Sequence, residues 1–519
     1  MSDAQIRLVP AQARGQSILA RAGSWLGWGA LFALAYGQSP LYTSNQNQYF
    51  LHGLARAGYG GLRRDWLAIT LDPTPVFSWL VRWTYSLAGP EAFYVIYGLL
   101  LAVYLISLAS ILRCSLGVHL RGAKRALLLA GLITLHSAAL RLVLGRLLGD
   151  DAAYLFEGGM AGQRLLGPVL QPSSFGALLL LSLALFFKRR PYAAAAAAAM
   201  AAVIHPTYLL AAACLVLGYQ WALIRRDGAR LSALVTGGIA LLLVLPTLLY
   251  TLTVFRPTSE ALWRESAQIL IGFRIPHHAE PAQWFGPLSV AKLALIAAGL
   301  WLSRRSRLLP ALASLTIFGV GLTLLELATG SDRLALLFPW RVSVVLVPLG
   351  SGLLLARLLS LVAGGLDRVN ASALHGACLA VAVLLAAAGL SRTWWLANEP
   401  DAADGVYNFV GQHLDIDDSY LIPPKLETFR LATGAPAFVD FKSIPYRDTD
   451  VIEWRERVQL ADFFYRDDPA LISCDVLEQI QQRASIDHVL LEAKQFGLTC
   501  PGMRLQYQDS YYALYRYQP

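Results

Sequence analysis

Long apolar runs separated by short polar connections fill the first three quarters of the chain. Residues 177–187 and 231–254 contain no charged residue, and several runs approach the ~20 residues that cross a bilayer. The pattern predicts about eleven membrane helices, near residues 18–36, 91–112, 125–145, 172–187, 192–204, 207–223, 231–254, 289–303, 308–327, 340–360 and 372–391. The runs 192–204 and 207–223 are short for a full crossing, so we expect a helical hairpin whose apex, around His205, stops inside the protein.

Polar and charged residues return after residue 391, and the pattern there changes. It predicts helices at 401–413 and 450–464 and strands at 420–423, 488–492 and 511–517. The expected fold is therefore an all-α polytopic membrane bundle, residues 1–391, followed by an α/β domain, residues 392–519.

Composition supports a membrane protein. Of the 519 residues, 56% are hydrophobic and 15% are charged, whereas roughly a quarter are charged in a soluble domain. The net charge of +9 lies in short arginine clusters between apolar runs and forms no continuous basic stripe, so no nucleic-acid partner is expected. The first apolar run is too long for a signal peptide and lacks a small-residue cleavage site, so we expect it to remain as the first span.

Arginine and lysine also predict the orientation. If successive connections alternate between the two sides, one side holds eighteen basic residues and the opposite short loops hold twelve. The positive-inside rule then places the N-terminus in the cytoplasm and the C-terminal domain in the periplasm of a bacterial inner membrane. Cys474 and Cys500 would lie in that oxidising compartment, where we expect them to form a disulfide.

The first outer loop combines amides with charged residues. Asn45 and Asn47 can bind sugar hydroxyls because each amide offers donors and acceptors, or they can simply tie down the loop. Its candidate ionic residues are Arg63, Arg64, Asp65 and Asp72.

In the second outer loop, carboxylates and arginines alternate at the membrane boundary. A carboxylate can act there as a general base, while arginine binds phosphate through paired, charge-assisted hydrogen bonds. The alternative is a set of internal ion pairs. The candidates are Asp150, Asp151, Glu157 and Arg164.

Arg274, His277, His278 and Arg341 form a third candidate group. Adjacent histidines on an extended chain point apart and no metal-ligand spacing is present, so we predict no metal site and favour sugar, phosphate or carboxylate contacts. His205 lies deep in apolar sequence, where it is either functional or bonded to a carbonyl that Pro206 leaves free. We expect Asp65 or Asp72, Asp150 or Asp151, Arg164 and Arg341 to face one common outer pocket.

These features resemble the GT-C superfamily of membrane glycosyltransferases. The likeness covers the architecture of nearly the whole chain: many short spans, two large charged outer loops and a trailing α/β domain. Four phrases also resemble an uncharacterised bacterial family of such proteins, namely those at residues 72–77, 171–176, 205–208 and 441–446. The resemblance implies a polyprenyl-phosphate-linked sugar donor in the membrane, with an acceptor saccharide that the sequence does not identify.

One departure from that family affects the catalytic assignment. GT-C enzymes usually carry an acidic residue shortly after the first span, where this chain has Asn45, Gln46 and Asn47. An amide cannot accept a proton from a hydroxyl, so the base would be Asp65, Asp72, Asp150 or Asp151. Arg64, Arg164, Arg274 or Arg341 would stabilise the departing phosphate.

A divalent cation can assist such a reaction, although the sequence shows no ligand set for one, and no cofactor is assigned. The alternative function is a non-catalytic protein on the same fold: a lipid or polysaccharide translocase, or an assembly factor.

Overall fold

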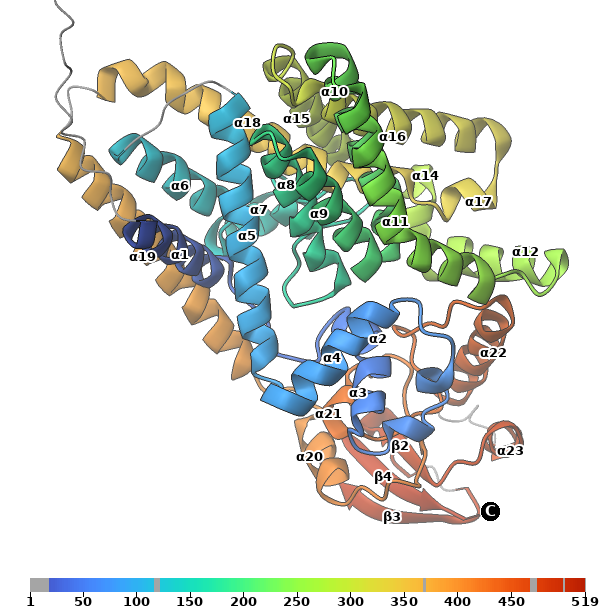
Figure 1. Ribbon diagram of the computed structural model, residues 1–519. Coiled ribbons are helices and arrows are strands. Elements are labelled where there is room, and N and C mark those ends of the chain that lie inside the picture. Colours follow the sequence, from blue (N-terminus) through green and yellow to red (C-terminus); the bar gives the residue numbers. More distant parts are fainter. Residues whose placement is uncertain (1–17, 116–121, 367–369, 467–473, 498–499, 519) are drawn as a thin grey trace, which may run out of the picture.

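Apolar helices make up most of the structure, and a small α/β domain lies at one end (Figure 1). The computed structural model describes residues 18–115, 122–366, 370–466, 474–497 and 500–518, so the predicted cytoplasmic stretch before residue 18 lies outside the described residues. Every segment predicted to span the membrane is helical. These helices are α1 (Ile18–Tyr36), α5 (Ala92–Ser115), α6 (Ala123–Leu135), α7 (Ala138–Leu148), α8 (Ala177–Phe187), α9 (Pro191–Ile204), α10 (Leu209–Asp227), α11 (Arg230–Val254), α15 (Pro287–Leu302), α16 (Leu309–Thr329), α18 (Ser343–Leu366) and α19 (Ala371–Ala397).

Several of these helices are long enough and apolar enough to cross a membrane. Six helices among the described residues pass that criterion, and α6 and α7, which meet at an angle of 45°, can form a seventh span. Helices α8, α9 and α15 are apolar but shorter, and at 1.5 Å per residue α9 extends only about 21 Å. The protein is a multi-pass membrane protein, and the figure of eleven crossings stays a prediction.

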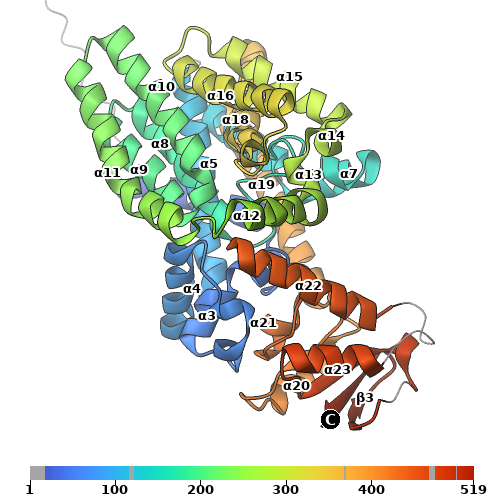
Figure 2. The ribbon, with the colours of Figure 1, turned by 90° about the vertical axis from the view of Figure 1, so that its right-hand side faces the viewer.

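Short helices fill the loops at the end of the bundle that faces the α/β domain (Figure 2). The amphipathic α4 was not foreseen: it buries Phe77 and Val81 and exposes Trp79 and Trp83. The short helices are α2 (Gln46–Tyr49), α3 (Leu51–Ala57), α4 (Pro75–Ala88), α12 (Glu260–Gln268), α13 (Pro276–Ala279), α14 (Pro281–Trp284) and α17 (Asp332–Ala335), with the 3-10 turns η1 (Leu62–Arg64), η2 (Leu67–Ile69), η3 (Asp150–Tyr154), η4 (Pro172–Gly176), η5 (Pro206–Tyr208) and η7 (Pro339–Val342) and the π-helical η6 (Ile269–Arg274).

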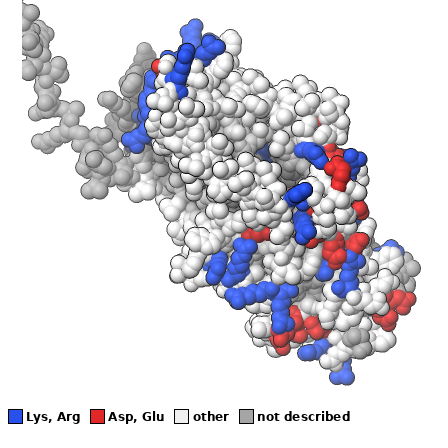
Figure 3. All heavy atoms as spheres, turned by 45° about the vertical axis from the view of Figure 1, so that its right-hand side comes forward, with Lys and Arg blue, Asp and Glu red and all other residues white. Residues whose placement is uncertain are grey.

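The opposite end of the bundle is held by a different charged group. Asp227 at the end of α10 forms ion pairs with Arg189, at 3.0 Å, and with Arg307. These contacts bring together three connections that the sequence assigns to the cytoplasmic side. Figure 3 shows a broad uncharged surface over the helical part, with charged side chains gathered at its upper end and again toward the α/β domain. The charge distribution fits a membrane band between two aqueous faces.

The α/β domain has one four-stranded sheet in the order β1-β2-β4-β3, with β1 and β2 parallel and the other pairs antiparallel. Side chains alternate along the central strands, so Val489 and Leu491 pack under α22 and α23 while Leu490 packs with α20 and α21 on the other face. Its elements are α20 (Asp404–Gln412), β1 (Tyr420–Leu421), α21 (Phe429–Thr433), α22 (Asp448–Phe464), α23 (Cys474–Arg483), β2 (His488–Glu492), η9 (Ala493–Gln495), β3 (Met503–Gln508) and β4 (Tyr512–Tyr517).

A disulfide joins Cys474 to Cys500, with 5.6 Å between their Cα atoms and a sequence separation of 26. In the chain-entropy model, closing a loop of this length stabilises a fold by about 3.5 kcal/mol. The bond fastens the start of α23 to the segment leading into β3.

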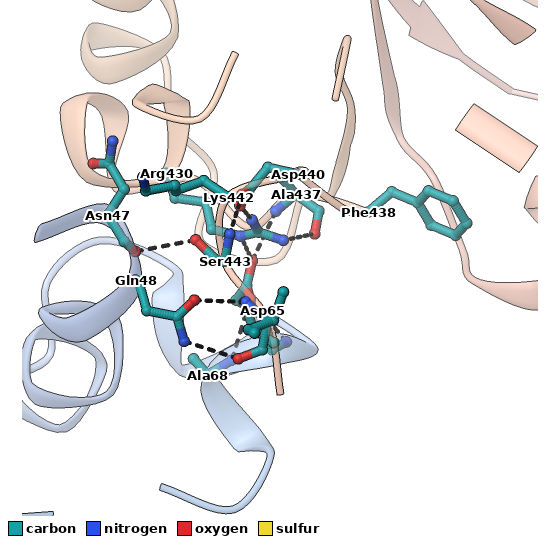
Figure 4. Close-up of polar contacts among 12 residues, drawn as sticks. Asn47, Gln48, Asp65, Ala68, Arg430, Ala437, Phe438, Asp440, Lys442 and Ser443 are labelled. Atoms are coloured by element: carbon teal, nitrogen blue, oxygen red, sulfur yellow. Dashed lines mark hydrogen bonds and ion pairs between the residues drawn. The ribbon is translucent and has the colours of Figure 1, made fainter. Parts of the chain in front are cut away.

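A buried ionic group docks the domain onto the first outer loop (Figure 4). The Asp65 carboxylate accepts from Arg430 Nε at 2.5 Å and from the Ala437 amide at 2.9 Å, while Arg430 also pairs with Asp440. Asp65 is 0% exposed and Arg430 is 2% exposed. Because ions this deeply buried are stable only when paired, the group fixes how the loop and the domain meet.

Neighbouring contacts extend this interface along residues 441–446. Gln48 exchanges two hydrogen bonds with the backbone of Ile444, at 2.7 and 2.8 Å, and Ser443 Oγ donates to the Asn47 carbonyl. Nearby, Gly60 has φ +52°, and a Cβ on it would come within 2.3 Å of the Gly434 carbonyl oxygen. Glycine is therefore required where the two backbones approach.

Arg430→Met should destabilise the α/β domain by about 3–5 kcal/mol, because it leaves two buried carboxylates without their cation. Pulse proteolysis of the purified protein across a denaturant series measures the change. Arg64→Met is the matched control, since the Arg64–Asp417 pair is 62% and 59% exposed and should contribute less than about 1 kcal/mol. Equal effects from the two variants would show that docking does not depend on the buried group.

Candidate functional site

Arg341 lies directly before the apolar helix α18. It lies in η7, where Pro339 starts the turn, and its Nη1 donates to His205 Nε2 at 3.2 Å and to Thr207 Oγ1 at 3.1 Å. Since Arg341 donates to Nε2, His205 is neutral with its proton on Nδ1. Arg341 Nε, His205 Nδ1 and the Trp340 indole nitrogen are all buried without a hydrogen-bond partner among the described residues.

This geometry bears on the two interpretations of His205. The residue lies at the break between α9 and η5 and is 2% exposed, so the apex of the hairpin is inside the protein. Within the described residues its Nε2 bonds Arg341 and its Nδ1 bonds no backbone carbonyl. The arrangement favours a functional role.

Arg274 and Lys442 come from two different parts of the chain and meet at the domain interface. Arg274 ends η6, and its Nη2 donates to the Lys442 carbonyl at 2.7 Å, while its buried Nε has no partner. Burial lowers the pKa of the Arg274 guanidinium, and it also lowers the pKa of the Lys442 ammonium. Glu427 opposes the shift of Lys442, whereas Arg274 and Arg164 add to it.

The second outer loop brings Arg164 and Lys292 together. Lys292 projects from α15, is 5% exposed and donates to the Gly159 carbonyl at 2.8 Å. Arg164 stacks on Tyr154, with 3.8 Å from its Cζ to the ring centroid, and lies within electrostatic range of Lys292. We call Arg164, Arg274, Lys292, Arg341 and Lys442 the cationic cluster.

His277 and His278 lie within reach of this cluster. The expectation that their side chains point apart is wrong, because the pair sits in α13 and the ring centroids are 4.0 Å apart. His278 Nδ1 bonds the Ala161 carbonyl at 2.6 Å, and burial, His277 and nearby arginines lower its pKa to about 3. Both rings are thus neutral groups beside the cations at neutral pH. No group of three or more potential metal ligands gathers in the part of the chain that the structure describes.

The predicted bases in the first loop have structural partners. Asp65 belongs to the docking group, and Asp72 pairs with Arg56 at 2.8 Å and accepts from the Thr74 amide. Both carboxylates are thus engaged in structural pairs, and the expectation that one of them faces a common pocket with Arg164 and Arg341 stays a prediction. Asp150 and Asp151 are exposed in η3, and of these two only Asp151 acts electrostatically on Lys292 and His277.

The remaining candidates are also tied into local structure. Glu157 is buried between Arg141, at 3.2 Å, and the Tyr36 hydroxyl, and burial raises its pKa. Four first-loop residues hold the loop to its neighbours: Asn45 donates to Gln171, Asn47 to Thr428 and Arg63 to the Ala55 carbonyl, while Arg64 pairs with Asp417. These contacts favour the structural interpretation for all five side chains.

Three charged residues of the site were not among the sequence candidates: Lys292, Lys442 and Glu427. Glu427 precedes α21 and is half-buried, and burial raises the pKa of its carboxyl, while Lys442 and Arg274 lower it. Lys442 belongs to the phrase at residues 441–446 that resembles the uncharacterised family, which was the available signal. Glu427 is the partly buried carboxylate that the α/β domain places beside these cations.

The similarity of this chain to known proteins is low or confined to a short segment. A domain of unknown function (DUF6798) matches residues 402–461, a small part of the chain, and no curated protein matches. A crystal structure of ArnT from Cupriavidus metallidurans bound to undecaprenyl phosphate is similar at 12% identity, with 96% of this chain and 98% of that chain covered and a TM-score of 0.47. The same protein in the apo state gives 12% identity, coverage of 95% and 98%, and a TM-score of 0.43.

Proposed function

We propose that this protein is a membrane glycosyltransferase that takes a sugar from a polyprenyl-phosphate-linked donor at the periplasmic face. The convergence of unpaired cations supports the proposal. Among the described residues, Arg274 and Arg341 each keep a buried Nε without a partner, and an anion would supply the missing acceptor. A phosphate at the end of a membrane lipid supplies such acceptors beside apolar helices.

Glycosyl transfer also requires a base, and Glu427 is the candidate that best fits the site. In the proposed step the acceptor hydroxyl oxygen attacks the anomeric carbon, its proton passes to the Glu427 carboxylate, and the bond from the anomeric carbon to the phosphate oxygen breaks. The electron pair leaves with the phosphate, whose charge Arg274 and Arg341 stabilise. Burial raises the pKa of the Glu427 carboxyl, which makes the carboxylate a stronger base toward the hydroxyl proton.

The arginine bias supports a periplasmic site, and the contacts between these loops and the C-terminal domain support placing both on the same side. Alkaline phosphatase fused after Pro519 should therefore be active, and the same reporter fused after Asp227 should be silent. A stable but silent fusion after Pro519 would place the site in the cytoplasm.

Glu427→Gln should lower turnover by about 10²- to 10⁴-fold and leave binding of radiolabelled undecaprenyl phosphate unchanged or tighter. Arg274→Ala and Arg341→Ala should weaken that binding by about 10- to 100-fold. Turnover is measured by mass spectrometry as polyprenyl phosphate released from the lipids of the protein's own organism. Glu265→Gln on the exposed face of α12 is the matched control.

Full turnover by Glu427→Gln would exclude Glu427 as the general base. Wild-type protein that binds the lipid but releases no sugar from any lipid-linked donor would favour the non-catalytic alternative, a translocase or assembly factor.

Binding of undecaprenyl phosphate should weaken at alkaline pH. Lys442 is charged below its pKa, and because burial lowers that pKa from 10.5, its charge and the affinity it supplies are lost before pH 10.5. A titration of affinity against pH should show this step, and Lys442→Arg should abolish it since arginine stays charged. Superimposable curves for the two proteins would exclude Lys442 as a phosphate contact.

A further inference from the structure

The cationic cluster is larger than one phosphate requires. A polyprenyl-phospho-sugar is a phosphodiester with one negative charge, and Arg274 and Arg341 already offer two guanidinium groups to it. Arg164 and Lys292 form a second group, donated by the second outer loop and α15. Lys442 lies within electrostatic range of both Arg274 and Arg164 and so connects the two groups.

We infer that the donor carries two adjacent phosphates, and that Arg164 and Lys292 bind the second one. This inference rests on the proposed function and specifies its substrate class as a polyprenyl-diphosphate-linked sugar. In the transfer step the anomeric carbon–oxygen bond breaks and a polyprenyl diphosphate leaves with the electron pair.

Lys292 provides the main structural evidence. Its side chain is 95% buried, yet its hydrogen bond among the described residues is to one carbonyl oxygen, although an ammonium has three donors. A buried cation without a paired carboxylate is costly in an apolar helix. Asp151 acts on Lys292 only from an exposed position. An anionic ligand would remove this cost.

Arg164 is oriented to share that ligand. Its guanidinium face lies on the Tyr154 ring, which leaves the N–H groups at its edges available. No side-chain hydrogen bond or ion pair of Arg164 occurs within the described ranges, whereas Arg141 in the same region is fully engaged by Glu157 and Tyr36. Arg141 therefore has a structural role, whereas Arg164 is available to bind a ligand.

The charges around the cluster also favour two phosphates. Glu427 acts on Lys442 and Arg274, and Asp151 acts on Lys292. Glu157 acts on Arg164 but is neutralised by Arg141, and the adjoining Asp65–Arg430–Asp440 group carries one further net negative charge. An excess of two positive charges remains. A diphosphate in diester linkage carries two negative charges and neutralises this excess, whereas a monophosphate diester leaves one cation uncompensated.

Binding of undecaprenyl diphosphate and undecaprenyl phosphate to the full chain in nanodiscs tests the inference. The diphosphate should bind at least about tenfold tighter. Arg164→Gln and Lys292→Met should each remove most of that preference and change monophosphate binding by less than about twofold. Arg146→Gln, an exposed arginine in the same region, should leave both affinities unchanged.

Equal affinity for the two lipids, or a preference that survives in both variants, would overturn the inference while leaving the proposed function intact. Failure of wild-type protein to bind either lipid would instead overturn the proposed function. Inorganic pyrophosphate should compete only at far higher concentration than the lipid, and competition at equal concentration would show that the site takes a free diphosphate.

Discussion

The buried Asp65–Arg430–Asp440 group is the interaction on which the site depends. Desolvated charges tolerate little displacement from their partners, so the group fixes the α/β domain against the first outer loop within narrow limits. Residues 441–446 follow directly in sequence and lie in the interface, where they contact Asn47, Gln48 and Arg274. The position of the Lys442 ammonium beside Arg274 is therefore a consequence of a salt bridge formed elsewhere.

In the loops that meet the α/β domain, some charged side chains form ion pairs and others keep hydrogen-bond donors without an acceptor among the described residues. Three buried carboxylates of the first two outer loops are each paired with an arginine: Asp72 with Arg56, Asp65 with Arg430 and Glu157 with Arg141. Nearer the meeting point of the loops, cations outnumber carboxylates and buried donors stay unsatisfied. Stability alone would select against such donors, because each costs free energy that a local acceptor would recover. Their retention fits a ligand that supplies the acceptors.

Sequence periodicity predicted the helices well, because a membrane segment must be apolar along its whole length, and it also predicted the central strands of the α/β domain. It missed β3, whose largely exposed edge position leaves no apolar alternation to detect. The candidate site was less accessible to sequence reasoning. Arg164, Arg274 and Arg341 were identified because charge beside apolar runs is conspicuous. The structural role of Asp65 could not be identified from the sequence, because its partner Arg430 is 365 residues away and pairing across that separation leaves no local pattern.

The amide residues that follow the first span have a structural role at the interface with the α/β domain. Asn47 and Gln48 hold residues 441–446: the Asn47 carbonyl accepts from Ser443 Oγ, and the Gln48 side chain exchanges hydrogen bonds with the Ile444 backbone. A carboxylate at Gln48 could not reproduce this contact, since it has no N–H to give to the Ile444 carbonyl. The same segment presents Lys442, on which Glu427 acts. The amide of Gln48 therefore helps to hold the segment that brings Lys442, and with it Glu427, beside the cations.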